Sequence, residues 1–261
     1  MKPALLALFL SVALFSCKQG KLEKAYTPRA LATDESFNEF PKEKGNALKI
    51  SKVDSSRKDG DLFVLKFRDT AILVQDGSKP LANKFYQPRF LNSQKTAALV
   101  QVLDSTGKGS PFYIVSLKNE QPEVISLARP SNGANDSKIT VGPEELSLST
   151  VLINNDYIIT LINGKVYPVK RQNEAERIQG KFLFNSPDKK TLVFATPTSL
   201  YQVNYVTGEA ENLAASAATL NPASVASNVQ QNYHFEKNVK GNYKLVKTDN
   251  NKIVDISEFK K

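Results

Sequence analysis

The side chains that most often carry out chemistry in proteins are scarce in this chain. Among its 261 residues there is one cysteine, Cys17, and one histidine, His234. A metal site built from several histidines is therefore excluded, and so is a cysteine nucleophile. A Ser-His-Asp triad requires His234, but the chain has no G-x-S-x-G elbow. His234 lies between Tyr233 and Phe235 in a predicted strand, so we interpret it as a structural or surface residue.

Carboxylates are the one reactive group that is abundant. The 26 acidic residues leave a pair of carboxylates for glycoside hydrolysis as an open alternative, although the chain has no tryptophan to form a flat sugar platform. The acidic cluster from Asp54 to Asp61 lacks the D-x-D-x-D-G spacing of a calcium loop, and Gly107 to Ser110 lacks the spacing of a phosphate-binding loop. We expect no catalytic residue, no metal site and no cofactor.

The first residues have the pattern of an export signal. Lys2 supplies a positive charge, and the apolar run from Ala4 to Leu14 is too short to span a bilayer as a helix. Leu14-Phe15-Ser16-Cys17 resembles a bacterial lipobox, in which a small residue precedes an invariant cysteine. The resemblance implies cleavage between Ser16 and Cys17, which removes residues 1–16. It also implies diacylglycerol on the Cys17 sulfur and an acyl group on the amine of Cys17 that the cleavage creates. A plain signal peptide with an incidental cysteine is the alternative.

The residues after Cys17 predict where the anchored protein sits. Lys18 stands where, in enterobacteria-like sorting, an Asp retains lipoproteins on the inner membrane. We therefore expect the bacterial cell envelope, lipid-anchored, with the outer membrane favoured over the inner. Residues 17–46 are polar, charged and poor in periodicity, which predicts a flexible tether below a domain at residues 47–261.

Composition limits the mature protein to one sizeable domain. Removal of residues 1–16 leaves 245 residues, enough for an all-β domain that buries its own core without disulfides. The net charge of +9 falls to +8 with the loss of Lys2. This excess favours anionic partners such as lipid headgroups, wall polymers or acidic proteins, unless it only solvates the surface. Nucleic acid is not expected, because the chain is exported and lacks RRM, KH and helix-turn-helix signatures.

The stretch from Phe182 to Leu213 predicts a four-stranded antiparallel meander. Four short runs rich in β-branched and aromatic residues alternate with segments rich in Pro, Gly, Asn and Asp, which is typical of strands joined by tight turns. Similar units are predicted at residues 47–83, 85–129, 139–178 and 233–256.

Two patterns support repetition of this unit. A constant offset of 88 residues aligns Phe112 to Val115 with Leu200 to Val203, and also Glu123 with Glu211. One tyrosine per unit, interpreted as a packing residue, recurs at spacings of 54, 34 and 42, near the 40–45 residues of a propeller blade. These tyrosines are Tyr113, Tyr167, Tyr201 and Tyr243.

One turn and the strand after it carry a family resemblance. Residues 185–195, NSPDKKTLVFA, resemble the S-P-D-G-K-x-hydrophobic run of TolB-like and WD40-like propeller repeats, with Lys189 in place of the usual Gly. The resemblance implies a β-propeller of about five four-stranded blades, completed by strands from both termini. It transfers a fold and no catalytic residue.

The sequence therefore predicts a membrane-anchored envelope lipoprotein whose β-propeller is a non-catalytic binding scaffold for a protein partner. Binding of an anionic wall polymer or lipid surface is one alternative, and a carboxylate-based glycosidase is the other. Partner-binding residues are not identified, but we expect them where the units differ. These segments are Asp104 to Ser110, Ser131 to Ser137, and Ala214 to Gln230, the last being a loop with one degenerate strand or a short helix before Pro222.

Overall fold

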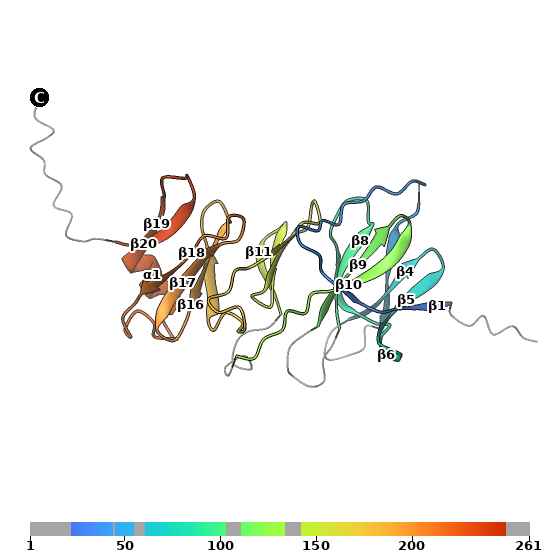
Figure 1. The fold of residues 1–261 in the computed structure, drawn as a ribbon, viewed down its shortest axis with the longest axis horizontal. Helices are drawn as coiled ribbons and strands as arrows, with labels where there is room; N and C mark the ends of the chain where they lie inside the picture. Colours follow the sequence, from blue (N-terminus) through green and yellow to red (C-terminus); the bar gives the residue numbers. More distant parts are fainter. Residues whose placement is uncertain (1–21, 44, 55–60, 103–110, 134–141, 249–261) are drawn as a thin grey trace, which may run out of the picture.

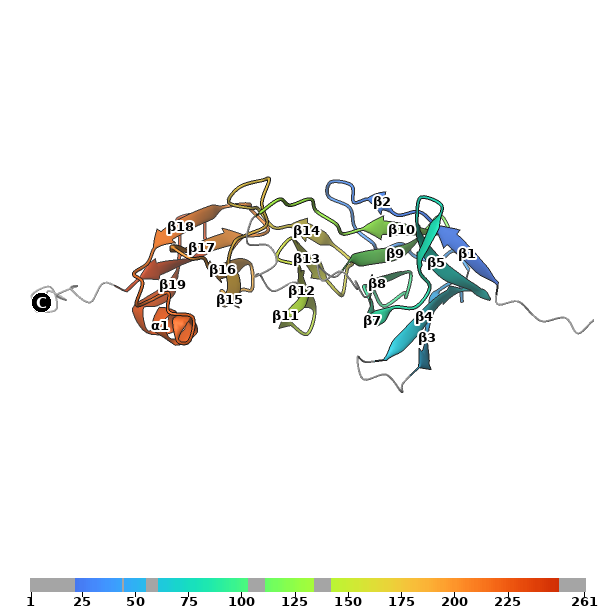
Figure 2. The ribbon, with the colours of Figure 1, turned by 90° about the horizontal axis from the view of Figure 1, so that it is seen from below.

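The protein is all-β in the part of the chain that the structure describes. The computed structural model describes residues 22–43, 45–54, 61–102, 111–133 and 142–248, and these form five β-sheets and one helix, α1 (Val225–Asn232). The sheets follow one another along the chain in a curved row (Figures 1 and 2). The all-β prediction is confirmed.

Strands that are neighbours in sequence pair antiparallel, so each of the first four sheets contains a four-stranded meander. The first contains β3 (Leu48–Asp54), β4 (Leu62–Phe67), β5 (Thr70–Asp76) and β6 (Lys79–Ala82). The second contains β7 (Tyr86–Phe90), β8 (Ala97–Gln101), β9 (Phe112–Lys118) and β10 (Gln121–Ser126).

The remaining sheets continue this order. The third contains β11 (Pro143–Ser147), β12 (Thr150–Ile153), β13 (Tyr157–Thr160) and β14 (Val166–Pro168). The fourth contains β15 (Lys181–Asn185), β16 (Thr191–Ala195), β17 (Ser199–Asn204) and β18 (Ala210–Ala214), which are the four runs predicted from the sequence. The fifth, after α1, is a hairpin of β19 (Tyr233–Lys237) and β20 (Tyr243–Lys247).

The sheets are held together by apolar layers between neighbours. In β8, Ala98 and Val100 face the first sheet, whereas Ala97 and Leu99 face the third. Successive side chains point to opposite faces of a strand, so a strand that is buried on both faces is apolar at nearly every position. A third layer joins the third and fourth sheets, and a fourth joins the fourth sheet to α1 and the hairpin.

Side-chain hydrogen bonds close the turn that carries the family resemblance. Ser186 Oγ donates to Asp188 Oδ1 at 2.6 Å and accepts from the Thr191 amide at 3.0 Å. Lys189 has φ = +64°, a left-handed conformation that glycine adopts without steric cost. This explains why Gly is common in such repeats at the position that Lys189 occupies.

The four tyrosines from which the repeat spacing was derived do not occupy the same strand in their sheets. Tyr113 and Tyr201 lie on the third strands of their sheets, but Tyr167 lies on the fourth strand β14 and Tyr243 on the second strand β20. The equivalent tyrosine of the third sheet is Tyr157, which pairs with Ile153 as Tyr201 pairs with Phe194. Tyr113, Tyr157 and Tyr201 are each 44 residues apart and all buried.

The constant offset of 88 holds for the third strands but not for the fourth. Glu123 pairs with Ser116, whereas Glu211 pairs with Gln202, which is equivalent to Ile114. The registers differ by two residues because eight residues separate Val115 from its partner Val124, whereas six separate the equivalent Val203 from Ala210. A shift of two keeps each side chain on its face of the sheet, so the apolar pattern does not reveal it.

A closed ring is not formed by the residues described. The first sheet lies at one end of the row, and α1 with the hairpin lies at the other (Figures 1 and 2). The N-terminal strands β1 (Glu23–Tyr26) and β2 (Arg29–Ala30) pair in parallel with β5 and β10 instead of reaching the last sheet. The prediction of a five-bladed propeller is therefore not confirmed.

The tether predicted for residues 17–46 is corrected where the structure describes it. Besides β1 and β2, this segment places Phe37, 3% exposed, in the layer between the second and third sheets. The Phe37 amide donates to Gly164 O at 2.9 Å, and a Cβ on Gly164 would lie 2.2 Å from Phe37 O. Single apolar residues and backbone pairing hold the segment, which is why its sequence lacks periodicity.

A buried ionic cluster joins the connections on either side of the third sheet. Asp156 Oδ1 accepts from Arg171 Nε at 3.0 Å and Nη2 at 2.8 Å, and Arg177 Nε lies 3.6 Å from Asp156 Oδ2. Arg171 also donates to the carbonyls of Arg129 and Pro130 on the preceding connection. Burial raises the pKa of the Asp156 carboxyl, and the hydrogen-bonded Arg171 opposes that shift.

Candidate functional site

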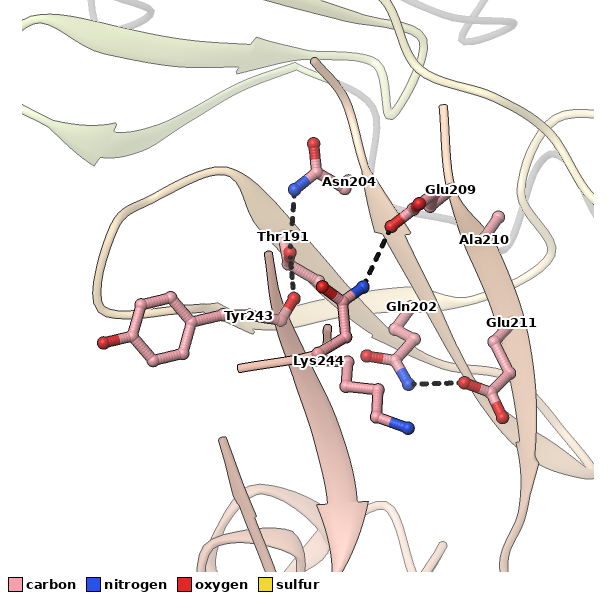
Figure 3. Close-up of a pocket in the computed structure, with 9 residues that line it drawn as sticks. Thr191, Gln202, Asn204, Glu209, Ala210, Glu211, Tyr243 and Lys244 are labelled. Carbon is pink, nitrogen blue, oxygen red and sulfur yellow. Dashed lines mark hydrogen bonds between the residues drawn. The ribbon is translucent and has the colours of Figure 1, made fainter. Parts of the chain in front are cut away.

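Polar side chains of the fourth sheet meet the terminal hairpin in a pocket of about 110 Å³ (Figure 3). Strands β16, β17 and β18 supply one wall, and the hairpin supplies the other. The lining residues are Thr191, Gln202, Asn204, Glu209, Ala210, Glu211, Asn238, Tyr243 and Lys244.

Most of these groups bind one another. Gln202, only 3% exposed, donates from Nε2 to Leu245 O at 3.0 Å and accepts from the Leu245 amide at 2.7 Å. Thr191 Oγ1 donates to Tyr243 O at 2.7 Å. Side chains of the fourth sheet, and not another strand, therefore form the hydrogen bonds to the backbone edge of β20 that faces this sheet. A glutamine at a core-facing position of an apolar strand is the sequence signal that points to this arrangement.

Glu209 fixes the tip of the hairpin. Its carboxylate accepts from Lys240 Nζ at 2.7 Å, Asn238 Nδ2 at 3.2 Å and Asn242 Nδ2 at 3.1 Å. The Lys240 and Asn242 hydrogen bonds hold the pKa of Glu209 below its usual range. A general acid needs a raised pKa, whereas that of Glu209 is lowered. The other acid of the pocket, Glu211, accepts a hydrogen bond from Gln202 Nε2 at 3.3 Å. The pocket therefore lends no support to the carboxylate-pair alternative.

The other edge of the hairpin, on β19, has backbone groups without a partner among the described residues. Because the Leu245 amide and carbonyl point toward Gln202, its cross-strand partner Phe235 must direct its own amide and carbonyl away from β20. The same alternation applies to Lys237, which faces Tyr243. No hydrogen bond to the outward groups of Phe235 or Lys237 occurs within the described chain.

The surroundings of this edge are basic. Lys237, Lys244 and Lys247 lie on the hairpin, and among the described residues none of them has a carboxylate within ion-pair distance. Glu236 is the only acid of the two strands. The edge therefore combines unpaired peptide groups with positive charge.

A second pocket, of about 380 Å³, opens beside the start of β19. Its walls come largely from the segment Ala214 to Gln230, in which the sequence predicted partner contacts. The helix in this segment, α1, begins after Pro222 and not before it. The lining residues are Ala214, Ser216, Ala218, Thr219, Asn228, Asn232, Tyr233 and Lys247.

Other sequence-predicted positions fall as follows. Cys17, the loop Asp104 to Ser110, and most of Ser131 to Ser137 lie outside the described residues. His234 is exposed on β19, with Nδ1 3.2 Å from Thr248 Oγ1. The open edge of β19 was not predicted, because the sequence does not show which strands lack a partner.

Comparisons with known proteins give no relative. No protein-family model matches the chain, and no curated protein matches it. Within the described ranges there is no cluster of three or more His, Cys, Asp or Glu side chains placed to hold a metal ion, and no helix has the length and apolar character to cross a membrane.

Proposed function

We propose that this protein is a lipid-anchored envelope scaffold that binds a protein partner without catalysing a reaction. The observation that carries the proposal is the outer edge of β19, whose outward amides and carbonyls have no hydrogen-bond partner in the described part of the chain. An exposed edge with unpaired amides and carbonyls accepts an extended segment of another chain as an additional strand. Lys237, Lys244 and Lys247 favour an acidic segment.

We also propose that the sheets are propeller-type blades, about five in number. The support is the consecutive antiparallel order of strands, the 44-residue spacing of Tyr113, Tyr157 and Tyr201, and the Ser186-Pro187-Asp188 turn. Successive four-stranded sheets packed face against face are the architecture of such repeats.

Site-specific photo-crosslinking in intact cells tests the β19 edge. A photoreactive residue replaces Glu236 on β19 and, as the matched control, Glu144, an exposed acid on β11. We expect one reproducible protein adduct from position 236 and none from position 144.

The Lys237→Pro variant makes this experiment specific for strand addition. The Lys237 amide points away from β20, so proline removes an outward donor without breaking the hairpin ladder. The adduct at position 236 should disappear in this variant. Adducts of equal yield at both positions, or an adduct that persists in Lys237→Pro, contradict the proposal.

The anchor is tested separately by Cys17→Ala. The variant lacks the sulfur that the lipid requires, so we expect loss of radiolabelled fatty acid and release from membranes that are washed at high salt, which screens any remaining electrostatic contact. A Cys17→Ala protein that stays in the membrane fraction and keeps the label contradicts lipidation at this residue.

A further inference from the structure

The two ends of the row differ in how their outer faces are covered. At the C-terminal end, α1 and β20 pack on the fourth sheet through Val225, Val229 and Leu245. At the N-terminal end, no described element covers the face of the first sheet that points away from the second sheet (Figure 2). Terminal units of a row of stacked repeats normally need a polar cap, so an uncovered end that is partly apolar calls for an occupant.

This outer face is partly apolar and hollowed. Leu22, Val53, Val64 and Ala71 line a pocket of about 220 Å³ on it, together with polar and charged residues. Leu22 is 68% exposed and Val53 44% exposed. The remaining lining residues are Glu23, Ser51, Lys66, Asp69, Asn83 and Lys84.

Two lysines on this face oppose each other directly. Lys49 of β3 is the cross-strand partner of Lys66 of β4, so their side chains lie on the same face of the sheet. Like charges in this position repel, and within the described residues neither lysine has an ion-pair partner. A negatively charged group above the pair relieves the repulsion. The pocket acids do not take this role, because Glu23 accepts from Asn83 Nδ2 at 3.2 Å and Asp69 lies in the β4–β5 turn.

The same face is where the chain arrives from the predicted lipid anchor. Leu22 lines the pocket, and five residues from Cys17 to Leu22 span at most about 17 Å even when fully extended. An anchor in the bilayer therefore holds this face close to the headgroups, whichever path the intervening residues take.

We propose that the outer face of the first sheet docks onto the surface of a bilayer that carries anionic headgroups. The inference rests on the lipid anchor of the proposed function, which brings the face to the membrane. Leu22 and Val53 enter the boundary between headgroups and acyl chains, and Lys49 and Lys66 contact lipid phosphates. The row of sheets then projects from the membrane, with the β19 edge at its far end.

Vesicle co-sedimentation of the full mature chain carrying Cys17→Ser tests the docking without the anchor. The probes are vesicles of phosphatidylcholine alone and of phosphatidylcholine with phosphatidylglycerol. We expect binding to the second kind, weaker binding to the first, and a decline with added salt. Val53→Glu should weaken binding about tenfold, because it places a carboxylate in the apolar contact. Val206→Glu, at a position of similar exposure (47%) in the β17–β18 turn of the fourth sheet, should leave binding unchanged.

Several results overturn the proposal. The first three are the absence of binding to either kind of vesicle, equal binding to both kinds, and equal loss of binding in Val53→Glu and Val206→Glu. The fourth is a stable dimer in solution that Val53→Glu dissociates, because a second copy of the chain then covers the face. Thermal unfolding followed by circular dichroism confirms that both variants are folded. Because the assay contains no protein partner and no lipid on residue 17, its failure leaves the β19 and Cys17 tests unaffected.

Discussion

At the scale of single residues, Asp156 is the only buried acid among the described residues. Its carboxylate is 2% exposed and faces Arg171, itself 1% exposed, with Arg177 nearby. These arginines bring the connection before the third sheet against the connection after it. A carboxylate at this position therefore holds the two connections beside the third sheet together through Arg171, although nothing in the local sequence distinguishes it from a turn residue.

Asp156→Asn should lower the free energy of unfolding by about 3 kcal/mol, because removal of one partner leaves buried arginine charge uncompensated. Urea denaturation measures the change. The control is Glu174→Gln, which removes an ion pair to Arg129 from a carboxylate that is 74% exposed and should cost less than about 1 kcal/mol. Equal effects of the two changes contradict the role assigned to the buried cluster.

At the scale of elements, the N-terminal segment is the part whose role differs most from expectation. β1 and β2 extend the first and second sheets, and Phe37 enters the core. Arg29 on β2 donates to Glu123 of β10 and to Glu35, which joins this segment to the second sheet by charge-assisted hydrogen bonds. The segment therefore contributes to the stability of the folded domain.

Phe37→Ala should cost about 3 kcal/mol of unfolding free energy, the usual cost of truncating a buried phenylalanine. Phe40→Ala is the matched control, since Phe40 lies three residues away and is 69% exposed, and should change stability by less than about 0.5 kcal/mol. Both are measured by urea denaturation. If this segment is a free tether in solution, the two variants will have the same stability.

The contribution of this segment to the stability of the fold should depend on pH. The hydrogen bond from Arg29 lowers the pKa of Glu35 below its ordinary value of 4.5. A lowered carboxyl pKa stabilises the folded state fully above 4.5, and that contribution is lost as the pH falls through the folded-state pKa. Arg29→Met should therefore reduce the acid-dependent loss of stability, measured by urea denaturation across this range. An unchanged pH profile in Arg29→Met contradicts the assignment.

At the scale of the whole molecule, the sheets follow one another in chain order, as the blades of a propeller do, but the described sheets lie in an open curve. Each sheet covers one face of the next, and α1 covers the C-terminal end of the row, whereas no element of the described ranges covers the outer face of the first sheet. The extended shape separates the proposed membrane face from the proposed partner edge by the full length of the row (Figure 1).

Small-angle X-ray scattering of the unlipidated mature chain tests this shape. A compact domain of 245 residues has a radius of gyration of about 18 Å. We expect a clearly larger value and an asymmetric distance distribution, because the sheets lie in a row. A value near that of the compact domain, independent of protein concentration, indicates closure of the ring.

The sequence by itself determined most strands of the four meanders and their order, but not the N-terminal strands β1 and β2. Short apolar runs between turn residues identify all four strands of the fourth sheet, since the pairing of adjacent strands depends on local turn chemistry. The structure adds that Lys189, which stands in place of the usual glycine, has a left-handed backbone conformation. The two-residue register difference between Glu123 and Glu211 is not visible, because it leaves each side chain on the same face.

Only the tertiary structure decided which faces and edges are covered. The burial of Phe37 and Asp156, and the use of Gln202 in place of a strand at β20, depend on segments far apart in sequence. The open edge of β19 and the uncovered face around Val53 depend on the same long-range packing. Apolar periodicity reports that a face is buried but not what buries it, so the candidate binding surfaces became visible only once the sheets were placed side by side.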